Sequence, residues 1–346
     1  MAFISFKPTD YFNTLLYTGN GSARSLTGVG FQPDIVWMKG RSTTDNHILC
    51  DAPRGVEEYI QPDTNAAEGS GPPSPNQSVT SFDADGFSIG GWSAINTNLA
   101  TQVAWNWKMG TTSGLSGGTL TPSAYSINTT SKQGIYKYTG TGSSATIAHG
   151  LGAAPSAIFI KKLSGADSWA CYMESAGNTK CMALDTSAAL ETGAGFWDST
   201  SPTSTVFTVK DNSRLNTSGQ DYVAYAFCDV PGYFQQGVYT GNADSTKGTF
   251  IYTGFSPGYV FVKNDASSEN WHAYDNKRNT INVRDLTLDP DQTSAESTLS
   301  GIDFTSSGFT LRTTATWGNG NAATYRYWAW AADPMIGSAG NPGLAK

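Results

Sequence analysis

One pattern occurs three times along this chain of 346 residues. In each copy, a Tyr-Thr-Gly sequence is followed by a polar turn, a proline and, six residues after the proline, a lysine. The copies start at Tyr17, Tyr138 and Tyr239, and their proline–lysine pairs are Pro33 and Lys39, Pro155 and Lys161, and Pro257 and Lys263. An internal repeat constrains the architecture more than any local motif, because every copy must form the same kind of unit.

Each copy also ends with a strand that carries two large aromatic residues at positions i and i+2. The second aromatic residue follows the proline by 74, 72 and 73 residues in the three copies. Because side chains alternate along a strand, both rings lie on one face and smaller residues on the other. The aromatic pairs are Trp105 and Trp107, Tyr225 and Phe227, and Trp328 and Trp330. We therefore predict three homologous repeats of roughly 100 residues, with these rings in the core.

Composition and turn signals favour an all-β fold. Charged residues make up only 14% of the chain and aromatic residues 12%, while glycine occurs 38 times. Amphipathic helical periodicity is nearly absent, and Asp85-Gly86 and Ser307-Gly308 lie between alternating apolar residues, as in β-hairpins. A single sheet would leave its aromatic face in water, which two packed sheets avoid. We predict three tandem β-sandwich repeats of jelly-roll or lectin-like type.

The repeats imply boundaries for the whole chain. The segment between the first two repeats is low in charge and rich in Gly, Ser and Thr, as in a linker. Phe3, Ile4 and Phe6 precede the first repeat, either as an arm that adds an edge strand to a neighbour or as a cap on that repeat. We predict an N-terminal arm over 1–10, repeats over 11–110, 132–231 and 232–335, a linker over 111–131 and a C-terminal tail over 336–346.

Charge and cysteine usage narrow the classes of function. The formal net charge is −7 and the sequence has no run of Lys or Arg, so we expect no nucleic-acid binding. The N-terminal MAFISFKPTDYF lacks the regions of a signal peptide, and the sequence has no apolar stretch of about 18 residues, so we expect no membrane insertion. The four cysteines lack zinc-site spacing, which favours reduced, buried thiols and folding in a cytoplasm.

No combination of residues has the spacing of a catalytic or metal site. Asp83 and Asp85 resemble half of a calcium loop, but the loop's final Glu is missing, so a plain turn is favoured over an ion site. The histidines His47, His149 and His272 belong to no zinc or Ser/His/Asp pattern. Glycan hydrolysis needs two facing carboxylates, and no such pair recurs among Glu57, Glu58, Asp85, Glu174 and Glu191. We predict no catalytic residue, no metal and no cofactor.

Two further sets of residues have both a structural and a functional interpretation. A lysine that ends an apolar strand usually protects a sheet edge or reaches the rim, and this is favoured over a repeated binding site for Lys39, Lys161 and Lys263. Aromatic residues exposed in loops are candidate sugar contacts. Flanking Gly or Asp residues indicate loop positions for Trp92, Trp197 and Trp317, which makes them candidate sugar contacts. Partial burial under neighbouring loops is nevertheless favoured for all three.

Two stretches carry a resemblance to a known group of proteins. GIYKYTGTG…HGLGAAPSAIFIKK and DYVAYAFCDVPGYFQQGVYTGN are similar to a repeated β-domain of uncharacterised virion proteins of tailed bacteriophages. The similarity covers about residues 11–335, and it departs in the first repeat, which has Val29-Gly30 before Phe31 and a Pro-rich insertion. The resemblance implies a place on a virus particle, as a tail fibre or another structural protein, and it carries over no catalytic motif.

The sequence leads to one hypothesis and two alternatives. The leading hypothesis is a non-enzymatic bacteriophage virion structural protein, either a tail fibre or adaptor or a capsid decoration, assembled in the host cytoplasm. Its expected partners are other virion proteins and further copies of itself. The first alternative is a carbohydrate-binding module of the tail that recognises a host-surface glycan, and the least favoured is a glycan depolymerase.

Overall fold

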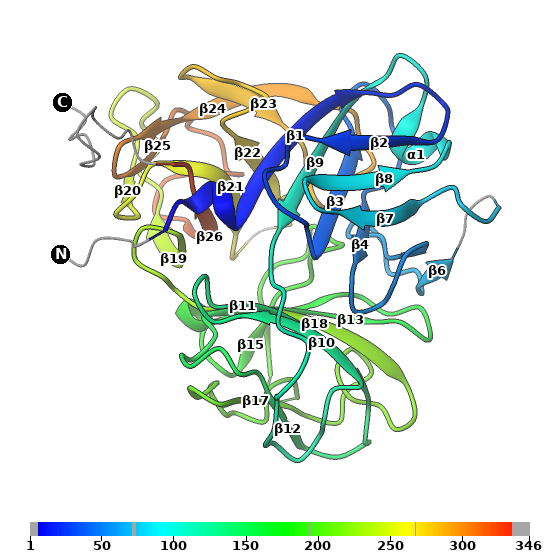
Figure 1. The fold of residues 1–346 in the computed structure, drawn as a ribbon. Coiled ribbons are helices and arrows are strands. Elements are labelled where there is room, and N and C mark those ends of the chain that lie inside the picture. The colour runs from blue at the N-terminus through cyan, green and yellow to red at the C-terminus, as the bar shows by residue number, and fades with distance from the viewer. Residues whose placement is uncertain (1–5, 71–73, 194, 267, 334–346) are drawn as a thin grey trace.

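The computed structural model describes residues 6–70, 74–193, 195–266 and 268–333, which form strands and loops almost throughout (Figure 1). The sheets are antiparallel, so the predicted all-β class is confirmed. Among the described residues, no helix has the length and apolar character that a membrane crossing needs.

Unit 1 is our name for residues 11–110. Its larger sheet has the strand order β1-β9-β3-β4, its smaller sheet has the order β2-β8-β7, and β5 pairs with β6. The hairpin predicted at Asp85-Gly86 is present, because Asp83 pairs with Gly86 across the turn from β7 to β8. The elements, with the turn that precedes them, are η1 (Pro8–Asp10), β1 (Phe12–Thr18), β2 (Arg24–Thr27), β3 (Ile35–Gly40), β4 (Ile48–Asp51), β5 (Glu58–Tyr59), β6 (Gly69–Ser70), β7 (Val79–Asp83), β8 (Gly86–Ile89), α1 (Ser93–Asn96) and β9 (Thr101–Trp107).

Unit 2 is residues 132–231, and the segment before it contributes one more strand. The larger sheet has the order β10-β11-β18-β13-β14, in which β10 comes from that preceding segment, and β12-β17 and β15-β16 are two-stranded. The elements are β10 (Ala124–Asn128), β11 (Gln133–Thr139), β12 (Ala145–Ala148), β13 (Ala157–Lys162), β14 (Ala170–Met173), η2 (Glu174–Ala176), β15 (Lys180–Cys181), β16 (Glu191–Thr192), β17 (Val206–Val209) and β18 (Asp221–Phe227).

Unit 3 is residues 232–333. Its two four-stranded sheets have the orders β19-β26-β21-β22 and β20-β25-β24-β23. The elements are β19 (Phe234–Thr240), β20 (Phe250–Tyr252), β21 (Pro257–Asn264), β22 (His272–Asp275), β23 (Arg284–Thr287), β24 (Ser297–Thr305), β25 (Gly308–Leu311) and β26 (Thr324–Ala331).

The larger sheets of the three units share one strand order. In each sheet, the strand that ends in Tyr-Thr (β1, β11 or β19) pairs with the closing strand (β9, β18 or β26). The closing strand also pairs with the strand that follows the proline (β3, β13 or β21), and this strand pairs with the next one along the chain (β4, β14 or β22). The registers also correspond, since Trp105, Tyr225 and Trp328 lie opposite Trp37, Phe159 and Phe261. The recurrence of order and register supports the repeat hypothesis taken up below.

Four apolar clusters hold the described residues together. Three of them each lie between the sheets of one unit, with a contribution from the segment before unit 2 in the second. The fourth, which we call the shared cluster, combines residues of all three units. The larger sheets therefore bury both faces, one inside their own unit and one against the other two units, and only the first of these was expected from the sequence.

The closing strands show how the two faces are divided. Ala104, Ala224 and Ala329 point into the clusters of their own units. The aromatic residues that alternate with them point into the shared cluster, where all six are at most 4% exposed. The rings are thus in a core, as predicted, but this core is supplied by neighbouring units rather than by the second sheet of the same unit.

The segment predicted as a linker is part of the structure of unit 2. Its residues 124–128 form β10, which covers the edge of β11. The backbone amides of Thr119 and Leu120 bond to the carbonyl of Thr146, so the same segment also covers β12. Leu120 and Ile127 are 5% exposed, and they bury apolar surface that a free linker would leave in water. The interpretation of residues 111–131 as a linker is therefore wrong.

Both ends of the described chain lie at the boundary between units 1 and 3. The Phe6 ring packs at 4.8 Å from the Tyr11 ring and 5.5 Å from the Tyr233 ring, as centroid distances. Thr9 donates from its backbone amide and its hydroxyl to the Asp333 carboxylate. The end of the predicted arm thus caps this boundary, while Phe3, Ile4 and the predicted tail at 336–346 lie outside the described residues.

Candidate functional site

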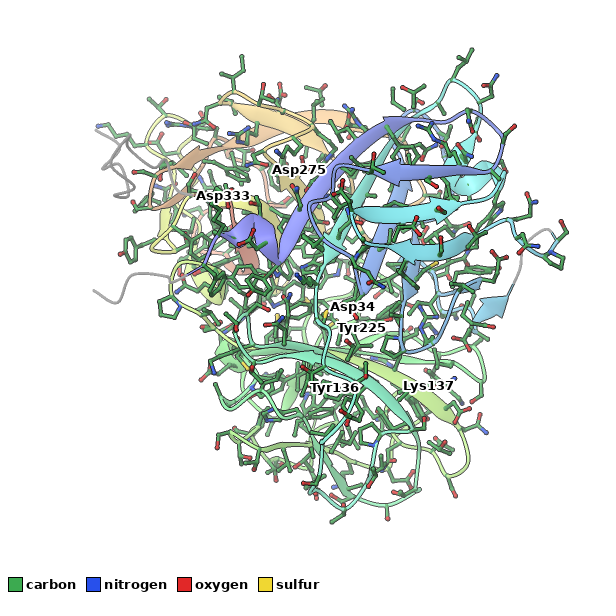
Figure 2. The ribbon with its side chains drawn as sticks, in the orientation of Figure 1. Asp34, Tyr136, Lys137, Tyr225, Asp275 and Asp333 are labelled. Atoms are coloured by element: carbon green, nitrogen blue, oxygen red, sulfur yellow. The ribbon has the colours of Figure 1, made fainter. Side chains whose placement is uncertain are left out.

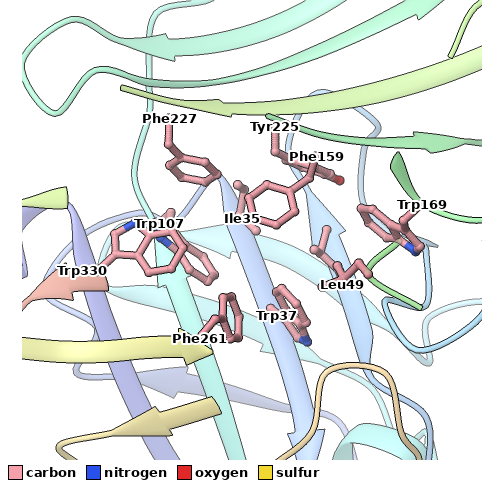
Figure 3. Close-up of a pocket in the computed structure, with 11 residues that line it drawn as sticks. Ile35, Trp37, Leu49, Trp107, Phe159, Trp169, Tyr225, Phe227, Phe261 and Trp330 are labelled. Atoms are coloured by element: carbon pink, nitrogen blue, oxygen red, sulfur yellow. The ribbon is translucent and has the colours of Figure 1, made fainter. Parts of the chain in front are cut away.

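The centre of the molecule is a cavity of about 30 Å³ inside the shared cluster (Figure 3). The volume is close to the space of one water molecule in the liquid, which is too small for an organic ligand. Rings of different units meet around it, with centroid distances of 5.6 Å for Trp37 and Phe261 and 5.4 Å for Phe227 and Trp330. This region joins the units rather than holding a ligand.

The residue 14 positions after each repeat proline reaches into a loop of another unit. His47 Nε2 lies 3.1 Å from the Asp289 carbonyl oxygen. Trp169 Nε1 donates to the Gln61 carbonyl at 3.1 Å, and Trp271 Nε1 donates to the Ala183 carbonyl at 3.0 Å. Unit 1 thus binds unit 3, unit 2 binds unit 1, and unit 3 binds unit 2. The three contacts run in one direction and close a ring.

The three repeat lysines follow the same direction. Lys39 Nζ donates to the Thr293 carbonyl at 3.1 Å, Lys161 Nζ to the Asn65 carbonyl at 3.1 Å, and Lys263 Nζ to the Ser187 carbonyl at 3.0 Å. Each amine also donates to a carbonyl of its own unit. All three lysines are 0% exposed, so the prediction that they lie at an exposed edge or rim is wrong. Burial lowers the pKa of each amine to about 8.

An aspartate completes the contact in each unit. Asp63, Asp185 and Asp291 accept a backbone N–H bond at 3.1 Å from His47, Trp169 and Trp271. Burial raises the pKa of Asp63 to about 6, that of Asp291 to about 7 and that of Asp185 in the same direction. We call each set of lysine, ring and aspartate a latch, namely latch 1 (Lys39, His47, Asp63), latch 2 (Lys161, Trp169, Asp185) and latch 3 (Lys263, Trp271, Asp291).

Two of the three boundaries add a buried ion pair. Between units 1 and 3, Asp275 Oδ2 bonds to Arg278 Nε at 2.5 Å and accepts from Trp105 Nε1 at 3.1 Å. Between units 2 and 1, Asp51 Oδ2 bonds to Arg54 Nε at 2.5 Å and accepts from the Tyr225 hydroxyl at 2.5 Å. Figure 2 shows Tyr225 on unit 2, at the boundary with the other two units. The side chains of both ion pairs are 0% exposed.

The third boundary is apolar at the corresponding positions. Met173 of unit 2 occupies the position that Asp51 and Asp275 occupy in units 1 and 3. Each of the three pairs with the strand that follows the proline, opposite Ala157, Ile35 and Tyr259, respectively. Ala176 stands three residues later, where the other units have arginine. The Trp328 ring nitrogen of unit 3 is buried and has no hydrogen-bond partner among the described residues. This boundary thus has no ion pair at these positions. Besides packing and a latch, it has hydrogen bonds from Arg326 Nη1 to the Ser175 carbonyl and from the Ser175 hydroxyl to Gln236 Oε1.

The residues with potential for catalysis are engaged in structural contacts. The Trp37 ring nitrogen donates to His47 Nδ1, and the Leu151 amide donates to His149 Nδ1. His272 Nδ1 lies 2.9 Å from Asp289 Oδ1. Burial lowers the pKa of His47 and His149. Cys50, Cys171, Cys181 and Cys228 are buried free thiols, and no group of three metal-binding residues occurs within the described ranges.

The Asp83 and Asp85 carboxylates hold the turn in which they lie. Asp83 accepts from the hydroxyls of Ser81 and Ser88, both at 2.7 Å. Asp85 accepts from the backbone amides of Gly28 and Gly30 at 3.1 and 2.6 Å. The carboxylate oxygens thus already have donors, which supports the turn interpretation over an ion site.

The candidate sugar contacts lie in different surroundings. Trp197 is 1% exposed and donates from Nε1 to the Lys180 carbonyl at 2.8 Å, and Trp317 is 7% exposed beside the His272 ring. Trp92 is half-buried and packs against Tyr59, with the ring centroids 4.8 Å apart. The three residues lie in three different units and are not brought together. Trp197 and Trp317 offer no exposed ring face to a ligand in this conformation.

Several residues of the boundaries were not singled out from the sequence. The aspartates of the latches lie 30, 30 and 34 residues after the repeat prolines, and Asp51 and Asp275 both lie 18 residues after them. These intervals were a usable signal, because a polar residue kept at one register position of a repeat has a shared structural environment. The partner loops carried no signal, since the lysines bind backbone carbonyls that any residue supplies.

Comparison with known proteins places the chain in a family without assigning an activity. A family model described as "Domain of unknown function (DUF7483)" matches residues 7–334. No curated protein and no solved structure matches the chain.

Proposed function

The chain belongs to the DUF7483 family, a domain of unknown function, and we propose that it is a non-enzymatic structural protein of a bacteriophage virion. In this proposal the chain is three homologous β-sandwich repeats closed around a pseudo-threefold axis. It serves as a tail fibre, a tail adaptor or a capsid decoration, and its partners are other virion proteins.

The observation that carries the proposal is the ring of latches. Each unit reaches into the next with the same two positions, the ring and the lysine of its latch, and the direction of these contacts is the same at all three boundaries. A unit on its own would expose the aromatic face of its larger sheet to water, at a cost of roughly 1.5–3 kcal/mol for each ring. The three units are therefore expected to form one rigid body, which suits a component of a particle that must survive outside a cell.

The use of the polar residues supports a non-enzymatic role. A catalytic site needs titratable groups that reach a substrate. Here the latch lysines and aspartates, the buried ion pairs and the histidines are bound to other parts of the same chain. The cavity with rings from all units has room for about one water molecule.

The virion assignment itself rests on the resemblance of the repeat sequences to a β-domain of phage structural proteins. The net charge of −7, the absence of Lys or Arg runs in the sequence and the turn-rich β architecture are in keeping with that role. Multiple equivalent units also strengthen weak contacts through effective concentration, which helps both lattice binding and host attachment.

Immunogold electron microscopy of intact phage particles tests the proposal. The antibody is raised against the purified chain, and pre-immune serum serves as the control. Label on the capsid would identify a decoration protein, and label confined to the tail would identify a fibre or adaptor. Particles without label, from a lysate in which the chain is detected, would contradict a virion role.

A further inference from the structure

Two exposed aromatic residues distinguish unit 3 from the other units. Phe250 and Tyr252 of β20 are 49% and 62% exposed, while Ile251 between them is 5% exposed and points into the unit. The strand β20 forms one edge of the smaller sheet, beside β25 (Figure 1). We propose that the outer face of this sheet, around the two rings, is a carbohydrate-binding site, a role that goes beyond the scaffold function proposed above.

The corresponding positions in the other units are not aromatic. Ile251 pairs with Phe309, as Leu26 of unit 1 pairs with Phe87, so Ser25 and Thr27 stand where unit 3 has its two rings. In unit 2, Ile147 pairs with Phe207, and its neighbours are Thr146 and Ala148. The chain before unit 2 bonds to the Thr146 carbonyl and covers that edge. The aromatic pair is therefore a feature of unit 3 and not a requirement of the repeat.

The rings border an open polar surface. Tyr252 pairs with Gly308 and Phe250 with Thr310, so the neighbouring strand presents no bulky side chain to either ring. A Cβ atom at Gly308 would lie 3.2 Å from Phe250 Cε2, which shows that the Phe250 ring lies across this glycine. Side chains at i and i+2 are roughly 7 Å apart along a strand and point to the same side. The two rings thus form a platform on the outer face.

Hydrogen-bonding groups lie next to this platform. Thr310 of β25 pairs with Asp303 of β24, the next strand in the sheet, so the Asp303 side chain is on the same face as the rings. Asp303 Oδ2 accepts from Arg312 Nε at 2.5 Å, and Arg312 Nη1 donates to the Thr246 carbonyl at 2.7 Å. The Arg312 side chain keeps 32% of its surface exposed. The site therefore offers a partly exposed guanidinium, held in place by Asp303, beside two apolar ring faces.

The size and polarity of the patch favour a sugar over a protein. Two rings with about half of their surface exposed offer roughly 200–250 Å², whereas a stable protein interface buries about 800 Å² on each partner. A purely apolar ligand would remove the exposed part of the Arg312 guanidinium from water without offering it an acceptor. A pyranose has an apolar C–H face that stacks on aromatic rings and hydroxyl groups that accept hydrogen bonds from a guanidinium. The patch fits one or two sugar rings of a longer glycan.

Affinity electrophoresis of the purified full chain tests the inference. Native gels are cast with dextran, mannan, xylan or a purified bacterial O-polysaccharide, and migration is compared with that in a gel without polysaccharide. The test variant is Phe250→Ser with Tyr252→Thr, which copies the residues of unit 1. The matched control is Ser25→Ala with Thr27→Ala, at the same positions of unit 1. Both pairs are on an outer face, so melting temperatures are expected to stay close to that of the unaltered chain.

The expected result is retardation of the unaltered chain and of the control in at least one gel. The test variant should bind at least about tenfold more weakly, because two stacking contacts are lost. Migration that no polysaccharide alters, or retardation that the test variant retains, would overturn the inference. Because this experiment uses purified protein, its failure is distinct from failure of the virion proposal, which the particle labelling decides.

Discussion

The boundary between units 1 and 3 and the boundary between units 3 and 2 solve the same packing problem with different chemistry. The first has the buried pair Asp275–Arg278, which also binds Trp105. The second has Met173 and Ala176 at those positions, and Trp328 stands there without a hydrogen-bond partner among the described residues. Both keep a latch and both bury aromatic rings. Apolar packing and the latch are thus common to the boundaries, while the ion pair is dispensable in one of them.

This difference indicates what each device contributes. Burial of aromatic rings supplies most of the free energy, because a desolvated ion pair roughly cancels its own Coulomb gain. A buried pair is nevertheless costly to break, because the remaining charge stays in a low-dielectric surrounding. The stability of two boundaries should therefore fall when one charged side chain is removed. The stability of the third should change mainly when the volume of a buried side chain changes.

The largest effect is expected from pH, because it acts on all latches together. The pKa of Asp63 is raised from 3.8 to about 6 and that of Asp291 to about 7, so these groups stabilise the fold at low pH and lose that contribution as pH rises through 6 to 7. The latch lysines have their pKa lowered from 10.5 to about 8, so they add stability above about 10 and lose it as pH falls to 8. The contribution of the latches to the stability of the fold is therefore lowest between pH 7 and 8.

Thermal unfolding from pH 4 to 10 measures this dependence. Asp291→Asn should reduce the fall in melting temperature between pH 4 and 7, since the titrating carboxyl group is gone. The exposed Asp211, at the surface of unit 2, provides the control variant Asp211→Asn. If the melting temperature of Asp291→Asn falls as much between pH 4 and 7 as that of the unaltered chain, Asp291 does not titrate as described.

The second largest effect is expected for Asp275→Ala. The variant leaves the Arg278 guanidinium buried without its main partner and removes the acceptor of Trp105 Nε1. Breaking one side of a buried pair costs about 3–5 kcal/mol. Urea unfolding at constant pH measures the loss. A cost below about 1 kcal/mol would mean that Arg278 is satisfied by Glu296, whose Oε2 lies 3.1 Å from Arg278 Nη1.

The all-β class and the buried aromatic faces of this fold were accessible from the sequence because the pattern that signals them is periodic. Alternation along the closing strands predicts a buried aromatic face, and the intervals after each proline predict corresponding strands. Periodicity does not reveal which surface covers that face. The second sheet of the same unit was the nearest candidate, and the structure instead places Trp105 and its counterparts against other units. The surface that covers these rings depends on how complete units pack against one another, and a local sequence pattern does not predict that packing.

The errors at Lys39 and residues 111–131, and the burial of Trp197, have related causes. A lysine at the end of an apolar strand usually reaches water, and here a loop from unit 3 supplies the Thr293 carbonyl instead. Glycine-flanked or aspartate-flanked tryptophans suggest exposed loops, but loops also cover one another. The short strand Ala124–Asn128 lies in a polar segment that has no clear strand signal in its sequence. It forms because its backbone pairs with the edge of β11.

The third prediction concerns the latch that all boundaries share. Lys263→Met keeps most of the side-chain volume and removes the donor for the Ser187 and Glu269 carbonyls. Buried acceptors without a donor cost about 1–3 kcal/mol, partly offset because a buried charge disappears. Lys210→Met is the matched control, since that side chain is 41% exposed, and it should change stability by less than about 0.5 kcal/mol. Equal urea midpoints for the two variants would contradict a stabilising latch.

The smallest effect is expected when one boundary is converted into the chemistry of another. Asp275→Met combined with Arg278→Ala copies Met173 and Ala176 of unit 2. No charge is left buried alone, and Trp105 Nε1 then resembles the unpartnered Trp328 Nε1. Replacing a buried ion pair by apolar groups is often nearly neutral, so the double variant should lie within about 1 kcal/mol of the unaltered chain in urea unfolding. Its stability should exceed that of Asp275→Ala by at least about 2 kcal/mol, which isolates the uncompensated charge as the cause of the larger loss. If the double variant is as unstable as the single one, the ion pair itself holds units 1 and 3 together, and the apolar boundary between units 3 and 2 depends on contacts of its own.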